Sequence, residues 1–226
     1  MIKNISNLGD SALYCDFGKE VNKDTNSNVI NYFKFIKKKN IYGITNLSPS
    51  YNKLIISFDL SLTNFDNLKK EIKNIKPKAF EIEKSNKIKI PVCCEKEFAL
   101  DNEILEKKLN NSIEEIHIKF FEKEYFCYMT GFIAGMPFLG DIDKKLQIKR
   151  LETPRVKVPK GSVGITEQFC NIYTFESPGG WNIIGNTPIN VFDKLNVLNP
   201  ALINPGDTVS FYKISRKEYE DWNEKK

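Results

Sequence analysis

The amino-acid sequence predicts an α+β protein with two domains of different texture, and two observations lead to this fold class. Before Pro77, hydrophobic residues recur twice at the spacing of an amphipathic helix, and short apolar runs that read as strands lie between them. From Tyr125 onward the helical spacing disappears, and Gly and Pro recur between short runs of β-forming residues. We therefore expect a mixed helix-and-strand domain, residues 1–88, followed by a β-rich domain, residues 89–226.

The first domain is predicted to run strand, helix, strand, strand, helix, strand. The helices are expected over residues 26–39 and 65–75, and the second helix stops at Pro77. The strands are expected over residues 11–16, 42–47, 53–60 and 87–92. This is the order of a ferredoxin-like fold, in which both helices pack on one face of an antiparallel sheet.

The second domain is predicted to begin with two short helices and to continue as strands. The helices are expected over residues 101–109 and 112–121, and Ser112 with Glu115 forms a capping box at the start of the second. Strands are expected over residues 125–130, 155–158, 171–176, 181–184, 189–192 and 208–214. Many short strands separated by Gly and Pro favour a closed barrel or a sandwich.

Composition limits the classes of function. The net charge of +5 is dispersed along the 226 residues, which argues against nucleic acid as a partner. The absence of a long apolar run and of a signal-peptide core predicts a cytoplasmic protein that does not contact membranes. The five cysteines are odd in number and lack Cys-x-x-Cys spacing, so we expect buried free thiols and no metal site. The single histidine, His117, is predicted to lie on a helix surface.

No common catalytic motif occurs in the sequence, which has no Walker A loop, no Gly-x-Gly-x-x-Gly turn and no Gly-x-Ser-x-Gly elbow. Three segments rich in Gly and Pro remain, at residues 131–140, 153–164 and 176–188. Their glycines expose backbone N–H groups, and Arg155 or Lys160 could complement a carboxylate or phosphate. Glu176 could act as a base or hold an ammonium group. The alternative is structural, with tight turns around a core Trp181.

The motifs in these segments resemble the KipI/PxpB family, which is also described as allophanate hydrolase subunit 1. The resemblance follows the chain in order over nearly its whole length. It rests on Tyr128-Met129-Thr130-Gly131-Phe132, Phe138-Leu139-Gly140, Thr153-Pro154-Arg155, Val158-Pro159-Lys160-Gly161-Ser162-Val163-Gly164-Ile165 and Glu176-Ser177-Pro178-Gly179-Gly180-Trp181.

The resemblance implies an N-terminal ferredoxin-like domain, a C-terminal cyclophilin-like β-barrel and a role as the B-type subunit of an ATP-dependent 5-oxoprolinase. Such a subunit works with a KipA/PxpC-like and a LamB/YcsF/PxpA-like subunit to convert 5-oxoproline, ATP and water to glutamate. The ATP would be shared with these partners, and this chain has no biotin attachment sequence. Two alternatives stay open: a KipI-like inhibitor of a sensor histidine kinase, or a component of a biotin-dependent carboxyltransferase of the allophanate or urea carboxylase type.

The predicted site combines two catalytic residues, Arg155 and Glu176, with a larger set that binds substrate or nucleotide. We expect Arg155→Ala to abolish the response to ligand with little change in melting temperature. The binding set consists of Phe138, Lys160, Ser162, Tyr173, Gly179, Gly180 and Trp181.

Several positions depart from the family pattern. Asn186 stands where an Arg is usual, and Phe120 stands where a His is usual. Bulky and acidic residues replace small ones in the Thr166-Glu167-Gln168-Phe169-Cys170-Asn171 loop. These changes indicate a divergent member, with an altered substrate or a regulatory role.

Overall fold

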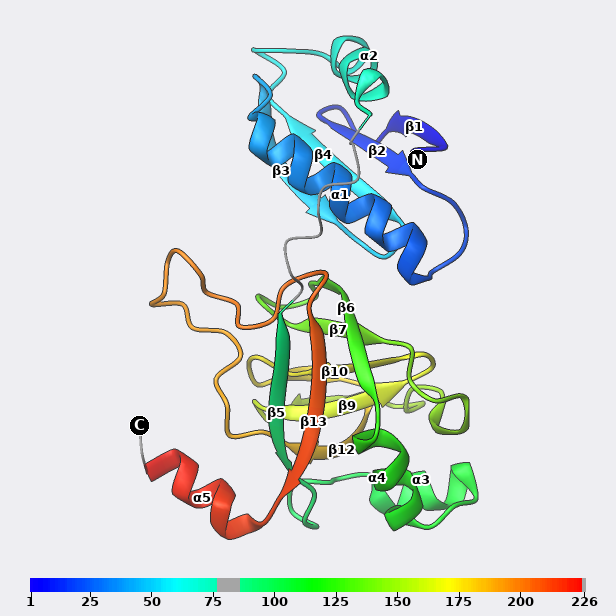
Figure 1. Ribbon diagram of the computed structural model, residues 1–226, viewed down its shortest axis with the longest axis vertical. Coiled ribbons are helices and arrows are strands. Elements are labelled where there is room, and N and C mark those ends of the chain that lie inside the picture. The colour runs from blue at the N-terminus through cyan, green and yellow to red at the C-terminus, as the bar shows by residue number, and fades with distance from the viewer. Residues whose placement is uncertain (77–85, 225–226) are drawn as a thin grey trace. The chain divides into compact units, whose positions relative to one another are not determined.

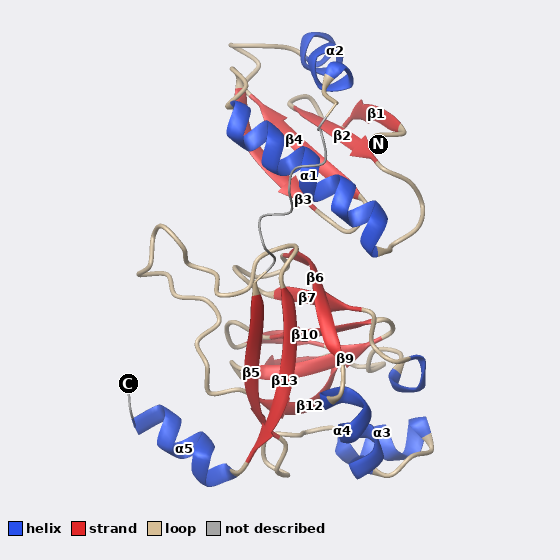
Figure 2. Cartoon of the chain, viewed as in Figure 1, coloured by secondary structure: helices blue, strands red, loops and turns tan. Residues whose placement is uncertain are grey.

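The computed structural model describes residues 1–76 and 86–224, which belong to two compact units, Met1–Ser85 and Asn86–Lys226. Figure 1 traces the chain through both units, and Figure 2 marks their helices and strands. Both helices and strands occur in each unit, and the larger unit contains a closed barrel. The predicted α+β fold class is confirmed.

The first unit holds a four-stranded sheet in the order β1-β2-β4-β3, with antiparallel neighbours throughout. Alternate residues of β4, Leu54, Ile56 and Phe58, are buried, as expected for a strand with one face on a core. Helix α1 packs on β3 and β4, and α2 packs on β2. The elements are β1 (Asn4–Asn7), β2 (Ala12–Asp16), α1 (Lys23–Lys39), β3 (Ile44–Pro49), β4 (Lys53–Phe58) and α2 (Phe65–Asn74).

One strand of the predicted ferredoxin-like order belongs elsewhere. The strand expected over residues 87–92 forms as β5 (Lys87–Cys93), but it pairs with strands of the barrel. Strand β1, which the sequence analysis did not predict, takes an edge of the first sheet through its pairing with β2. The assignment of β5 to the first domain was therefore wrong, and the ferredoxin-like arrangement stays a prediction.

The second unit is built around a closed barrel of seven strands in the order β10-β7-β6-β13-β5-β12-β9. All neighbouring strands are antiparallel except β5 and β13, which run parallel over seven residue pairs. A separate two-stranded sheet pairs β8 (Arg155–Val158) with β11 (Ser177–Gly179). The remaining barrel strands are β6 (Glu124–Thr130), β7 (Pro137–Gly140), β9 (Ser162–Thr166), β10 (Phe169–Ile172), β12 (Asn182–Asn186) and β13 (Thr208–Ile214).

Helices flank the barrel in the described part of this unit: α3 (Asn102–Leu109), α4 (Ile113–Phe121) and α5 (Arg216–Glu224) (Figure 1). Phe120 of α4 is fully buried, and its ring stacks on Phe211 at 5.0 Å between ring centres. The Tyr125 hydroxyl donates to the Phe120 carbonyl at 2.7 Å. The aromatic residue at the position of the family's usual His is therefore a core residue.

The single histidine is buried, so its predicted place on the helix surface was wrong. His117 is 6% exposed, and its Nε2 atom has no hydrogen-bond partner within residues 1–76 and 86–224. Burial and the nearby Lys213 ammonium group lower the pKa of His117 to about 4. The imidazole is therefore neutral at neutral pH.

The cysteines follow the prediction, because all five are free and buried. Burial raises the pKa of the Cys94 thiol to about 12, which leaves it protonated and unreactive at neutral pH. Across the described part of the chain, no three His, Cys, Asp or Glu side chains gather as a metal site would require. None of the helices in that part has the length and apolar character that a membrane crossing requires.

Several strands of the barrel unit were predicted at the wrong place or were not predicted. The strand expected over residues 171–176 lies earlier, as β10, and residues 189–192 form only an isolated bridge between Phe192 and Ala201. The elements β7, β9, β11 and α5 were not predicted. Strands β7 and β11 lie inside the Gly- and Pro-rich segments 131–140 and 176–188, and β9 begins at the end of the segment 153–164.

Candidate functional site

An aromatic cluster forms where the chain enters β12. Trp181 is 5% exposed, and the half-buried Phe138 of β7 meets its ring edge-on at 5.6 Å between ring centres. The Arg150 guanidinium group lies 5.9 Å from the centre of the Trp181 ring. This distance is that of a cation–π contact, so a positive charge is held beside a flat aromatic surface.

The two glycines before Trp181 allow other groups to approach the backbone closely. A side chain at Gly179 would collide with the hydroxyl and ring of Tyr173, so only glycine fits this position. The Gly180 carbonyl accepts a hydrogen bond of 2.7 Å from the Leu151 backbone N–H. The pair therefore fixes the Tyr173 ring and the segment before β8 against the entrance to β12.

Tyr173 is buried in this cluster, and burial raises the pKa of its phenol. Smaller opposing effects come from a hydrogen bond with the Asn171 side chain and from the positive charges of Arg150 and Arg155. Tyr173 is therefore a neutral hydroxyl at neutral pH, suited to donate a hydrogen bond and not to act as a phenolate.

Arg155 is fixed by an aspartate that the sequence analysis did not select. Its Nη2 atom donates to Asp101 Oδ1 at 2.6 Å, and Asp101 Oδ2 accepts from the Ile183 backbone N–H at 2.7 Å. The Asp101 side chain is fully buried, whereas that of Arg155 is 26% exposed. Asp101 thus ties β8 to β12, and it holds the guanidinium group of Arg155 in one place.

The carboxylate of Asp101 does not cap the helix that follows it. It precedes α3, where an aspartate usually caps the helix, yet it makes no side-chain cap hydrogen bond. A cap position explains an Asp in a sequence, so the sequence contained no signal for its pairing with Arg155. The structure therefore adds Asp101 to the candidate site.

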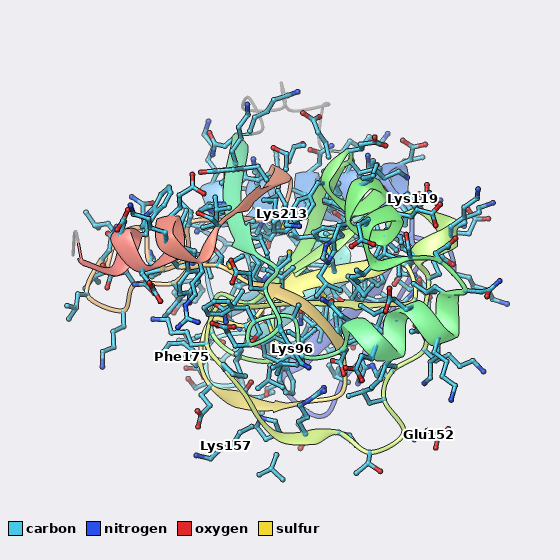
Figure 3. All side chains as sticks on the ribbon, turned by 90° about the horizontal axis from the view of Figure 1, so that it is seen from below. Lys96, Lys119, Glu152, Lys157, Phe175 and Lys213 are labelled. Carbon is cyan, nitrogen blue, oxygen red and sulfur yellow. The ribbon has the colours of Figure 1, made fainter. Side chains whose placement is uncertain are left out.

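Glu176, the second predicted catalytic residue, lies on the surface. It pairs with Lys157 at 3.1 Å between Oε1 and Nζ, and both side chains are more than half exposed. Figure 3 labels Lys157 at the periphery of the barrel unit. A carboxylate in this setting is hydrated and screened, so the geometry adds nothing to its predicted role as a base.

Lys160 and Ser162 come together at the far end of β12, around Asn186. Asn186 Nδ2 donates to the Lys160 carbonyl at 2.9 Å and lies 3.5 Å from Ser162 Oγ. Asn186 Oδ1 accepts a hydrogen bond of 2.9 Å from the Tyr219 hydroxyl of α5. The polar groups of Asn186 are satisfied within the chain, and Lys160 contributes its backbone instead of its amine.

The predicted residues thus separate into three places. Lys160 and Ser162 surround Asn186, and Glu176 stands in its exposed ion pair. The other six lie close together through the contacts above and the pairing of Arg155 with Gly179 across β8 and β11. We call these six residues and Arg150 the tryptophan face: Phe138, Arg150, Arg155, Tyr173, Gly179, Gly180 and Trp181.

The tryptophan face has the chemistry of an anion site with an aromatic wall. Arg155 Nη1 is buried without a hydrogen-bond partner in the described structure, and so is the hydroxyl of Ser177. Buried polar atoms of this kind are normally satisfied by water or by a ligand. Guanidinium groups match carboxylate and phosphate in shape and charge, and the Arg150 guanidinium group on this face is exposed.

Comparison with known proteins decides the family. A model of the family described as carboxyltransferase domain, subdomain C and D, matches residues 3–203. The chain belongs to this family. It is also 32% identical to the B-type subunit of Bacillus subtilis 5-oxoprolinase, over 97% of this chain and 96% of that protein. The expected place in the KipI/PxpB family is therefore confirmed.

Two solved structures share the architecture. One, named TTHA0988, superposes with a TM-score of 0.81 at 26% identity, and the match covers 91% of this chain and 40% of that one. The other is the urea carboxylase of Kluyveromyces lactis, with a TM-score of 0.78 at 20% identity, covering 96% of this chain and 22% of that one. This chain therefore spans less than half of either protein, and the second likeness concerns the fold alone.

Proposed function

We propose that this chain is the B-type subunit of a multi-subunit, ATP-dependent hydrolase that opens a cyclic amide, with 5-oxoproline as the substrate. The observation that carries the proposal is the end-to-end match to the B-type subunit of B. subtilis 5-oxoprolinase. The alignment covers almost the whole of both proteins, which supports a shared role for the two chains.

The chemistry of a lactam explains the need for ATP and for several subunits. An amide carbonyl is a poor electrophile, and phosphorylation of its oxygen converts that oxygen into a leaving group. Such a step needs cationic and N–H donors around the phosphoryl oxygens and a site that excludes water. In our proposal Arg155 and Arg150 supply positive charge to this step, and the Trp181 ring forms one apolar wall.

The substrate fits the same residues. 5-Oxoproline combines a small flat ring with a carboxylate, which matches an aromatic surface flanked by guanidinium groups. We assign ring contact to Trp181 and Phe138, and carboxylate or phosphoryl contact to the exposed guanidinium group of Arg150, with Arg155 beside it. Tyr173 is assigned a hydrogen bond to the bound ligand, and Gly179 and Gly180 a close backbone approach.

The site is completed by other chains in this proposal. The sequence has no nucleotide-binding motif of its own, so ATP is shared with a KipA/PxpC-like and a LamB/YcsF/PxpA-like subunit. The B. subtilis relative is named as a subunit, which supports the existence of such partners. We place the assembly in the cytoplasm.

The test is ATP-dependent release of glutamate from 5-oxoproline by the three purified subunits of one organism. Arg150→Gln removes a charge from an exposed side chain next to Trp181, and we expect it to lower kcat/KM by about 100-fold. Lys157→Gln is the matched control, because it removes an exposed charge from β8, and it should keep nearly full activity. An assembled complex that releases no glutamate refutes the proposal.

A second candidate rests on the family's description as a carboxyltransferase domain. In that case the chain would be one component of a biotin-dependent carboxyltransferase, and turnover would require a carboxybiotin carrier. Supplying such a carrier with the chain and its partners, and measuring carboxyl transfer to urea, separates the two reactions. The histidine-kinase inhibitor stays a prediction, for which kinase autophosphorylation is the assay.

A further inference from the structure

We infer that the loop between Phe192 and Ala201 is the element by which the barrel unit binds a companion polypeptide of its assembly. Three aliphatic side chains form the end of this loop, Leu195, Val197 and Leu198, and we call them the apolar tip. The inference rests on the proposed function in one respect, since it requires a multi-subunit assembly.

The side chains of the apolar tip are almost fully exposed to solvent, although all three are aliphatic. Leu195 is 82% exposed, Val197 84% and Leu198 89%. Figure 1 draws the segment between β12 and β13 in orange as an excursion that projects from the barrel, and Figure 2 shows that it is loop. Three large aliphatic side chains gathered in four residues on a projecting loop mark an interaction site, whereas single exposed ones do not.

Internal hydrogen bonds shape the loop. The Asp193 N–H donates to the Pro200 carbonyl at 2.8 Å, which closes the stem beside the bridge between Phe192 and Ala201. Within the loop, the Leu195 N–H donates to Asp193 Oδ1 at 3.0 Å. The Asn199 N–H donates to Asn196 Oδ1 at 3.1 Å. A loop ordered in this way loses less conformational entropy when a partner binds it.

The stem of the loop is anchored to segments next to the tryptophan face. The Phe192 ring fills the space where Gly135 would carry a side chain, and Gly135 has a φ of 68°. Phe192 also meets Phe175 edge-on at 5.7 Å between ring centres. Gly135 lies shortly before Phe138, and Phe175 lies shortly after Tyr173. The stem therefore packs on chain segments that lead to two residues of the tryptophan face.

The relatives support a companion polypeptide as the occupant of the tip. The matched region is only 40% of the TTHA0988 chain, so in that protein further sequence is covalently joined to it. The B. subtilis relative has this region alone and is named a subunit. A region that is part of a longer chain in one relative and a separate subunit in another would bind its companion through a non-covalent interface in the second case.

The chemistry of the tip defines the partner's surface. Aliphatic side chains at the centre of an interface fill an apolar groove, and polar residues around them form the rim. Asp193 and Lys194 beside the tip carry opposite charges and are exposed, so they form a rim without a dominant sign. We therefore expect an apolar groove on the companion polypeptide, with no requirement for a strongly charged one.

The experiment measures binding of the full chain to the KipA/PxpC-like subunit of the same organism by isothermal titration calorimetry. We expect the triple variant Leu195→Asp/Val197→Asp/Leu198→Asp to bind about 100-fold more weakly than wild type, and Leu198→Asp alone about 10-fold more weakly. Leu60→Asp is the matched control, since Leu60 is also an exposed loop residue, 60% exposed, and its affinity should be unchanged. Melting temperatures verify that every variant is folded.

Three results would overturn the inference: equal affinity of wild type and the triple variant, no binding by wild type, or a wild-type dimer that the triple variant dissociates. The last result would identify a second copy of the chain as the occupant. Glutamate release separates this inference from the proposed function. A complex that forms through the tip but releases no glutamate refutes the function alone, and a fully active complex containing the triple variant refutes the docking loop alone.

Discussion

Strand β8 carries two ion pairs that differ in one physical respect, which is burial. Arg155 pairs with Asp101, whose side chain is fully buried, while Lys157 pairs with Glu176 in a setting where both side chains are mostly exposed. In the sequence, Arg155 and Glu176 are both charged residues within family motifs, and nothing there separates them as catalytic candidates. Only the buried pair fixes a side chain in a defined position, so the two predicted catalytic residues are not equivalent.

The largest effect that tests this comparison is expected from Arg155→Ala. The substitution leaves the buried Asp101 carboxylate without its charged partner, and we expect the free energy of unfolding to fall by about 4 kcal/mol in urea titrations. This revises the expectation that the melting temperature would hardly change. Lys157→Ala is the control and should stay within about 0.5 kcal/mol of wild type. Equal losses in the two variants would show that burial does not separate the pairs.

His117 extends the comparison to a buried ionisable group that lacks a hydrogen-bond partner at Nε2 in the described structure. Its pKa is lowered from 6.5 to about 4 in the folded protein, so the unfolded chain takes up a proton first as the pH falls. The stabilisation is complete above pH 6.5 and is lost as the pH falls toward 4. Because of His117, the free energy of unfolding should fall by about 3 kcal/mol between pH 7 and pH 4.

The measurement is urea unfolding at a series of pH values for wild type and His117→Leu. Carboxylates also titrate near pH 4, so the informative quantity is the difference between the two proteins at each pH. That difference should change by about 3 kcal/mol from pH 7 to pH 4, in favour of the variant at the lower pH. A difference that is constant across this range would contradict the burial of an uncharged imidazole.

A double-mutant cycle compares the ion pairs directly. We expect a coupling of about 2 kcal/mol between Asp101→Leu and Arg155→Met, because removing both charges avoids the unpaired buried charge left by either change alone. The corresponding cycle with Glu176→Gln and Lys157→Met should give a coupling of about 0.3 kcal/mol. Unfolding free energies of the single and double variants supply both values. A negligible coupling for the first pair would mean that the Asp101 carboxylate is stabilised by backbone N–H groups alone.

The smallest effect is expected from Glu176→Gln. The exposed pair with Lys157 should contribute less than about 0.5 kcal/mol to stability, and high salt should abolish even that contribution. If Glu176 is not a base, glutamate release by the assembled complex should also stay within about twofold of wild type. A loss of 100-fold or more with unchanged stability would restore Glu176 to the catalytic set.

Local patterns in the sequence were sufficient for most helices and for strands with alternating hydrophobic residues. Helices α1 and α2 have their apolar stripes and asparagine caps, and β13 was predicted with its observed bounds. Strands β7 and β9 were missed, because their Gly and Pro residues read as turns while the barrel buries them. The placement of β5 failed for another reason, since its partner β13 lies far along the chain and pairing at that distance leaves no local signal.

The candidate site was predictable to the extent that motifs cluster in the sequence. Gly179, Gly180 and Trp181 are consecutive, and the structure brings Phe138, Tyr173 and Arg155 to them. The sequence alone could not identify Asp101 as a site residue, because helix capping already explains an Asp at this position. Arg150 was not among the predicted site residues, although its guanidinium group lies over the Trp181 ring.

The parallel pairing of β5 with β13 has a consequence for how the protein is made. Strand β13 lies between β5 and β6, so the barrel cannot close until residues 208–214 have left the ribosome. The strands already synthesised expose unpaired edges and apolar faces during that interval, which is when aggregation competes with folding. The first unit has its own core and needs none of those residues, so it can fold while the rest of the chain is still being synthesised. The barrel unit can fold only after its last strand has been made.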